Sequence, residues 1–195
     1  MPNWCMNTVR ITHPHDKEIV RDLATAASRG DIFQMIKPTP FALRVTTAGS
    51  FADEDKQQHN QALEADNQER FGYKNWWDYQ VSEWGTKWEP SIGSVEVTED
   101  GDSATLYLYF DSAWSPPLGI YEELQKCGFD VDASYYEPGM DFAGVWINGE
   151  DAYVEEISSN DYNDDEFWEG DLIKRIDEDF NVREFLNPDL EEGVC

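Results

Sequence analysis

The chain has 195 residues, of which 40% are hydrophobic and 14% aromatic, enough apolar material for one main domain with a packed core. Its 41 acidic and 14 basic residues give a net charge of -27, which argues against direct nucleic-acid binding because such binding relies on Lys and Arg neutralising phosphates. No apolar run approaches the roughly 18 residues of a membrane span, so we expect a soluble cytoplasmic protein with no membrane contact. Its three cysteines, Cys5, Cys127 and Cys195, are then free thiols. The sequence leaves the oligomeric state open.

The first third of the chain predicts a strand, a helix and a polar surface segment. Residues 7–12 have the composition of a strand, and residues 15–30 have a helical pattern that ends at Gly30. The stretch 41–71 is polar and predicts a loop followed by a surface helix.

An aromatic stripe follows at helical spacing. Its members, spaced by four, four, three and four residues, share one helical face: Tyr73, Trp77, Val81, Trp84 and Trp88. Such a stripe is more often core than pocket, so Trp84, Trp88 and Trp114 are predicted to bury against a sheet. Lys87 interrupts the apolar pattern, and we expect it to lie on an indole or to pair with a carboxylate. The alternative is a pocket formed by Trp84, Lys87, Trp88, Trp114 and Glu137.

The middle of the chain predicts the rest of one antiparallel sheet. Two β-rich runs within residues 91–114 flank Asp100-Gly101, which indicates a hairpin. A helix over 116–129 and strands over 130–136 and 142–148 follow. The predicted fold is α+β, a ferredoxin-like antiparallel sheet with helices on one face. It occupies residues 1–149 and contains a helical insertion at about 50–90.

Residues 150–195 predict an acidic extension packed on that domain. They hold 17 acidic and three basic residues, and Trp168, Leu172, Ile176 and Phe180 recur every four positions, which predicts one amphipathic helix over about 165–180. The candidate contact surface is the run of carboxylates on and before this helix: Asp161, Asp164, Asp165, Glu166, Glu169 and Asp171. The opposing interpretation is that these carboxylates only keep the protein soluble.

No motif in the sequence points to catalysis, a metal or a cofactor. Cys5, His13 and His15 lie close together, but nothing completes a zinc ligand set. A calcium-loop pattern beginning at Asp161 fails where Glu166 replaces the required glycine. We therefore expect no catalytic residue, no metal and no cofactor.

Four motifs carry a resemblance to a known family: "MPNWCMN", "WGTKWEP", "SAWSPP" and "YYEPGMDFAG", in this order within about residues 1–149. The chain resembles the YubB-like family of phage and plasmid proteins, whose shared region is a ferredoxin-like domain. It departs from that family's pattern at Glu83, Glu89 and Ser112, where the family has Asn, Asp and Thr. The resemblance implies residence in a mobile genetic element and brings no established reaction.

Together with the charge, this resemblance predicts a non-enzymatic protein that binds a basic host protein in the host cytoplasm. The partner would be a DNA-processing or defence enzyme, and the acidic surface would act in counter-defence, with DNA mimicry as one form of it, because a basic groove attracts a negative surface. Two alternatives are a structural or folding accessory of the element and an enzyme that uses the cluster of tryptophans around Lys87.

Overall fold

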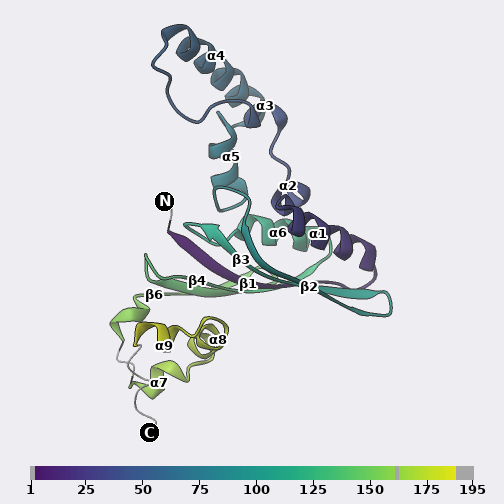
Figure 1. Cartoon of the computed structure of the whole chain (residues 1–195), viewed down its shortest axis with the longest axis vertical. Coiled ribbons are helices and arrows are strands. Elements are labelled where there is room, and N and C mark those ends of the chain that lie inside the picture. Colours follow the sequence, from purple (N-terminus) through teal and green to yellow (C-terminus); the bar gives the residue numbers. More distant parts are fainter. Residues whose placement is uncertain (1–2, 161–162, 188–195) are drawn as a thin grey trace.

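The computed structural model describes residues 3–160 and 163–187, which form an α+β protein around a six-stranded antiparallel sheet (Figure 1). The strand order is β2-β3-β1-β4-β5-β6, and each neighbouring pair is antiparallel. The strands are β1 (Trp4–His13), β2 (Ser91–Asp100), β3 (Ser103–Ala113), β4 (Asp130–Glu137), β5 (Phe142–Ile147) and β6 (Glu150–Glu155).

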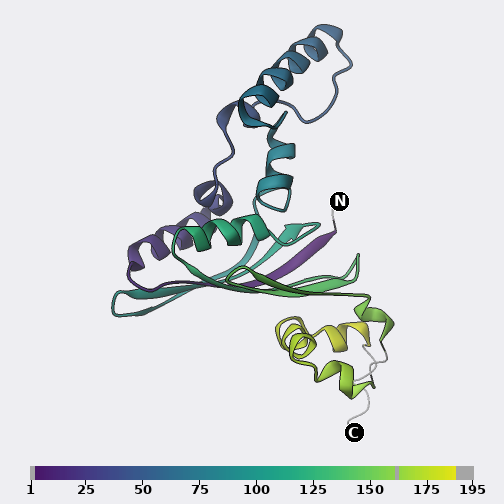
Figure 2. The same ribbon diagram turned by 180° about the vertical axis from the view of Figure 1, so that it is seen from behind.

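Helices lie on both faces of this sheet. The helices are α1 (Lys17–Arg29), α2 (Ile32–Ile36), α3 (Phe41–Arg44), α4 (Glu54–Phe71), α5 (Trp76–Glu83), α6 (Leu118–Lys126), α7 (Asp165–Trp168), α8 (Asp171–Phe180) and α9 (Val182–Leu186), with a 3-10 turn at Ile157–Ser159. Helices α1 and α6 cover one face, α7 to α9 lie against the other, and α3 to α5 project away from the sheet, as both views show (Figures 1 and 2). Within residues 1–149, the helices that pack on the sheet thus lie on one face, as predicted, and the separately predicted extension covers the opposite face.

The main core lies between the sheet and the pair α1 and α6. Helix α1 begins where the Asp16 carboxylate accepts hydrogen bonds from two backbone N–H groups, and it ends at Gly30 in the left-handed conformation, as predicted. Its buried face, including Val20 and Leu23, packs against alternate residues of β1 and the neighbouring strands. The sequence periods of 3.6 in the helix and two in the strand thus meet in one core.

The predicted hairpin over residues 91–114 is confirmed. Strands β2 and β3 pair from Ser91 with Asp111 to Asp100 with Ser103, and Gly101 in the connecting turn has a positive φ of 61°. Glycine adopts this conformation without the steric cost that a side chain brings.

The insertion is longer than predicted. All of α2, α3, α4 and α5 lie between α1 and β2, so it spans residues 31–90 and not only about 50–90. We call residues 31–90 the arm. Its long helix α4 buries two amides, Asn60 and Asn67: Asn67 donates to Thr46 Oγ1 and to the Lys74 carbonyl, and Asn60 donates to the Thr47 carbonyl. Polar contacts thus hold α4 to the rest of the arm.

A second, smaller apolar cluster attaches the C-terminal extension to the sheet. Strands β4 and β5 present Tyr136 and Val145 to this face, where they pack with Trp168, Ile173 and Ile176. Strand β6 pairs with β5, so the predicted boundary at residue 149 separates two strands of one sheet. None of the helices in residues 3–160 and 163–187 is both long and apolar enough to cross a membrane.

The single helix predicted over about 165–180 is two helices. Gly170 separates α7 from α8 with an extended backbone, φ -61° and ψ 134°. The apolar residues at four-residue spacing still face the sheet on both sides of this break: Trp168 and Ile176 are buried, and Leu172 and Phe180 pack at the edge of the cluster. The period was correct, but the chain leaves the helical conformation at Gly170, between the two buried positions Trp168 and Ile173.

Candidate functional site

The segment 82–90, "SEWGTKWEP", ends α5 and turns the chain into β2. Trp84 is fully buried in the main core, as predicted, and its indole N–H donates to the Lys37 carbonyl at 2.8 Å. Gly85 follows with a positive φ of 85°, and a Cβ there would lie 3.1 Å from the Pro116 carbonyl oxygen. The loop before α6 therefore packs backbone against backbone on this turn, which only glycine permits.

An ion pair closes the base of the arm. Lys37 Nζ lies 2.6 Å from a Glu83 carboxylate oxygen, and the Tyr73 hydroxyl donates to the same carboxylate. The hydrogen bond from Lys37 is the main cause that lowers the pKa of Glu83, and the hydrogen bond to Glu83 raises the pKa of Tyr73. Glu83 has a structural role in this arrangement.

The side chains of Glu89 and Thr86 also form hydrogen bonds with backbone groups. The Glu89 carboxylate accepts from the N–H groups of Phe33 and Gln34 at 2.9 and 2.8 Å. These backbone groups lie in the first turn of α2, where they have no acceptor within the helix. Burial raises the pKa of Glu89. Thr86 Oγ1 donates to the Ala113 carbonyl at 2.7 Å. The polar residues of this motif thus stabilise the turn itself.

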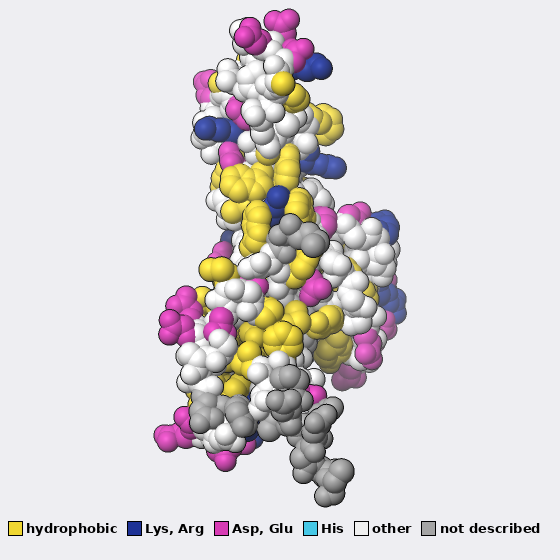
Figure 3. All heavy atoms as spheres, turned by 60° about the vertical axis from the view of Figure 1, so that its left-hand side comes forward, with side chains coloured by type: hydrophobic (Ala, Val, Ile, Leu, Met, Phe, Trp, Pro, Cys, Tyr) yellow, Lys and Arg dark blue, Asp and Glu magenta, His cyan; other side chains and the backbone are white. Residues whose placement is uncertain are grey.

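Lys87 differs from its neighbours because its side chain contacts indoles. Its Nζ lies 4.0 Å from the ring centroid of Trp88 and 4.9 Å from that of Trp114, so of the two expected contacts, an indole or a carboxylate, the indole is present. We call these three residues the Lys87 cluster. Figure 3 shows hydrophobic side chains gathered where the arm joins the sheet, with a basic side chain among them.

The predicted burial of Trp88 and Trp114 is wrong, because these side chains are 39% and 40% exposed. Helix α5 ends at Glu83, so the expected stripe is not one helical face; Trp77 and Val81 are also exposed, and only Trp84 enters the core. Trp114 follows β3 with a positive φ of 71°, a conformation that costs a bulky residue about 1–3 kcal/mol. Contacts of the surrounding structure must offset this cost, although the indole itself is partly exposed.

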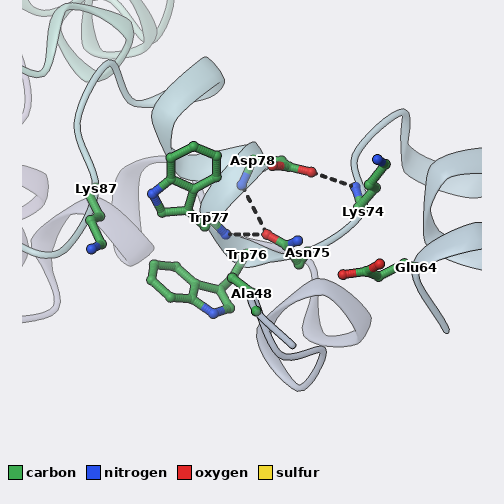
Figure 4. A pocket seen from close by; sticks show the side chains of 9 residues that line it. Ala48, Glu64, Lys74, Asn75, Trp76, Trp77, Asp78 and Lys87 are labelled. Atoms are coloured by element: carbon green, nitrogen blue, oxygen red, sulfur yellow. Dashed lines mark hydrogen bonds between the residues drawn. The ribbon is translucent and has the colours of Figure 1, made fainter. Parts of the chain in front are cut away.

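A pocket of about 490 Å³ opens beside the Lys87 cluster (Figure 4). Lys87 forms one end, the indoles of Trp76 and Trp77 lie in the middle, and Glu64 and Lys74 lie beyond them. The remaining lining residues are Ala48, Gly49, Asn75 and Asp78. We call this the arm pocket.

Asn75 is central to this pocket and escaped the sequence prediction. It is 6% exposed, and its Oδ1 accepts from the N–H groups of Trp77 and Asp78 at 3.0 and 3.2 Å, which starts α5. An Asn immediately before an apolar helical run is a known helix start, so "NWWD" contained a usable signal for this helix, though not for the pocket. Lys74 and Trp76 also went unpredicted, since neither fits the aromatic stripe.

Glu137, which the sequence grouped with the tryptophans, has a local structural role. It is buried, and its two carboxylate oxygens accept from the N–H groups of Gly139 and Met140 at 2.8 and 2.6 Å. It is not among the residues that line the arm pocket. Its carboxylate closes the turn between β4 and β5.

The carboxylates predicted as a contact surface are exposed wherever they are described. Asp164 caps α7, Asp165 lies 3.0 Å from Arg183, and Glu169 lies 2.8 Å from Lys174. The carboxylates of Glu166 and Asp171 accept no hydrogen bond and form no ion pair among the described residues, whereas Asp161 lies outside them. The surface thus combines internally paired carboxylates with free ones.

Within residues 3–160 and 163–187, no three His, Cys, Asp or Glu side chains come together as metal ligands would. Cys5 is a buried free thiol and Cys127 an exposed one.

Comparison with known proteins gives one distant likeness. No protein-family model and no curated protein matches the chain. Among solved structures, it is similar to the protein api92 from Yersinia pseudotuberculosis, described with the family-model DUF1281. The two share 13% identity over 80% of this chain and 98% of that chain, with a TM-score of 0.41. A likeness of this size identifies neither a family nor a function for this chain.

Proposed function

We propose that this is a non-enzymatic binding protein that associates with a basic partner protein through its acidic C-terminal extension. The observation that carries the proposal is the distribution of charge pairs. The extension has 17 acidic and three basic residues, and all three basic side chains are occupied by carboxylates: Lys174 by Glu169, Arg175 by Asp132 and Arg183 by Asp165. Its surface therefore offers unpaired carboxylates, which attract a basic surface and accelerate encounter at low salt.

The resemblance to YubB-like proteins supports the biological setting of this proposal. The order β2-β3-β1-β4, with α1 and α6 in the connections, is consistent with a ferredoxin-like core. A phage or plasmid protein of this kind acts in the host cytoplasm, and its partner is a DNA-processing or defence enzyme. The basic groove that normally holds DNA is then the part that the carboxylates occupy.

The test compares charge reversals at two places. Glu166→Lys with Asp171→Lys changes the two candidates that have no internal partner, so no ion pair is lost in the protein itself. The matched control, Glu69→Lys with Glu122→Lys, reverses two exposed carboxylates outside the extension. Both variants and the wild type capture partners from host extract at low and moderate salt, and association rates follow with the purified partner.

We expect the extension variant to associate about tenfold more slowly at low salt, because rim charges mainly steer encounter. The control should keep the same partner, and duplex DNA should displace it. Equal recovery with both variants would assign binding to another surface. If the wild type itself captures no basic protein, the proposed function is wrong.

A further inference from the structure

The arm pocket is rich in hydrogen-bond donors that have no acceptor among the described residues. Lys74 Nζ and Lys87 Nζ form no hydrogen bond or ion pair with any described residue, although the chain has 41 acidic side chains. The indole N–H groups of Trp76 and Trp77 also lack a hydrogen-bond acceptor among these residues. Four donors, two of them cationic, thus meet at one pocket.

Asn75 adds a fifth donor that is held in place. Its Oδ1 is engaged by two backbone N–H groups of α5, so the orientation of the amide is determined. Its Nδ2 makes no hydrogen bond with the described residues, although only 6% of the residue is exposed. Figure 4 shows this nitrogen on the side of the amide away from the two hydrogen bonds, facing the end with Glu64 and Lys74.

The acceptors of the pocket are already in use. Asp78 accepts from the Lys74 backbone N–H at 3.3 Å, and Glu64 accepts from the Asn60 amide at 3.3 Å. Free donors with engaged acceptors favour a ligand that supplies acceptor oxygens, and the two ammonium groups favour an anion. Both carboxylates lie away from Lys87, beyond the indoles (Figure 4), so they do not oppose an anion at the Lys87 end.

The indoles of Trp76 and Trp77, between the Lys87 end and the Lys74 end of the pocket, favour a ligand that also has a flat apolar part. Trp77 is 38% exposed, and it lies with Trp76 between Lys87 and Asn75. Aromatic side chains bind nucleobases by stacking, because every base has a π face. A volume of about 490 Å³ suits a small molecule of a few hundred daltons.

We propose that the arm pocket binds a nucleoside phosphate. The phosphate lies at Lys87 and the Trp77 indole N–H, the base stacks on the indoles, and the Asn75 Nδ2 donates to an acceptor on the base or the ribose. The ligand is a free nucleotide and not a nucleic-acid strand, because a net charge of -27 repels a polyanion far more than a single phosphate. This site is independent of the acidic extension, so either proposal can fail without the other.

Calorimetric titration of the full chain at low ionic strength tests the proposal. The probes are AMP, GMP, CMP and UMP, with the matching nucleosides and inorganic phosphate as partial ligands and a short oligothymidylate as the strand. NMR detects the same binding through the indole N–H signals of Trp76 and Trp77, which single Trp→Phe substitutions assign.

We expect at least one mononucleotide to bind ten or more times tighter than its nucleoside or phosphate alone, and to shift both indole signals. Lys87→Gln should weaken that binding at least tenfold, whereas Lys56→Gln, at another unpaired lysine of the arm, should change it less than twofold. Trp77→Leu should act like Lys87→Gln, and Trp4→Leu, at an exposed indole outside the pocket, like the lysine control. Circular dichroism verifies that each variant is folded, and Lys87→Met replaces Lys87→Gln if that variant is not.

Three results would overturn the proposal. The first is no binding of any mononucleotide at millimolar concentration. The second is equal binding of phosphate alone, or an equal effect of the pocket and control substitutions. The third is tighter binding of the oligothymidylate than of every mononucleotide, which would replace the free nucleotide by a strand.

Discussion

The arm and the C-terminal extension differ in whether their basic side chains form ion pairs. The arm has ten acidic and six basic residues, and four of its cations have no carboxylate partner among the described residues: Arg44, Lys56, Lys74 and Lys87. In the extension, every basic side chain is paired. Net charge alone would assign the whole molecule to cationic partners. The pairing pattern distinguishes a surface with available cations from one with available carboxylates.

The two regions also differ in the contacts that attach them to the rest of the protein. The extension packs apolar side chains such as Ile173 and Ile176 against the sheet. The arm relies on buried amides, Asn60 and Asn67, and on Trp84 and the Lys37–Glu83 pair at its base. Truncating an apolar side chain should therefore destabilise the extension, whereas the arm should respond to changes at its base.

The largest effect is expected at the joint between the arm and the main core. Trp84→Ala should lower the free energy of unfolding by about 3–5 kcal/mol, because it removes a large buried side chain and leaves a cavity. Denaturant titration measures this. Trp88→Ala is the matched control and should cost about 1 kcal/mol or less, since it removes an exposed cation–π contact. Similar losses for both would mean that the surface tryptophans are as structural as the buried one.

A substitution in the extension tests whether its apolar cluster stabilises it independently of the arm. Ile176→Ala should cost about 2–4 kcal/mol, since Ile176 is 1% exposed beneath the sheet. Hydrogen exchange should show faster exchange in α8 with α4 unchanged, because α8 packs in the smaller apolar cluster, whereas polar contacts within the arm hold α4. Glu178→Ala, on the exposed side of α8, is the control. Faster exchange in both helices would show that the regions unfold as one unit.

A smaller and pH-dependent effect is expected from Glu83. Its pKa is lowered in the folded protein from the ordinary value of 4.5, mainly by Lys37, so its contribution is present above pH 4.5. That contribution disappears as the pH falls through the lowered pKa. Glu83→Gln should cost about 1.5 kcal/mol at pH 7, and this difference from the wild type should shrink as the pH drops below 4.5. Glu69→Gln, an exposed carboxylate of α4, should show no such trend; a constant difference for Glu83→Gln would contradict the ion-pair explanation.

The smallest effect concerns the whole charge. Salt screens the repulsion among excess negative charges, so the melting temperature should rise by a few degrees between about 10 and 150 mM sodium chloride at neutral pH. Glu166→Lys with Asp171→Lys should reduce this rise. A melting temperature that falls with salt would mean that local ion pairs outweigh the net repulsion.

Local sequence patterns determined much of this protein. The strand period and Asp100-Gly101 predicted the hairpin, Gly30 marked the end of α1, and the four-residue spacing in the extension identified the residues that meet the sheet. These features depend on neighbours a few residues away, where period and turn chemistry act directly. The sequence also predicted that Lys87 contacts either an indole or a carboxylate, and the structure shows the indole contact.

Only the tertiary structure decided which tryptophans are buried, which face the extension covers and where a pocket lies. A helical period states that Trp77, Trp84 and Trp88 share a face only while the helix continues, and α5 stops at Glu83 because Gly85 packs against the backbone before α6. The arm pocket joins α4, the start of α5 and Lys87, which are separate elements of the arm that meet only through packing. Periodicity describes one element at a time, whereas a binding site depends on how several elements pack together.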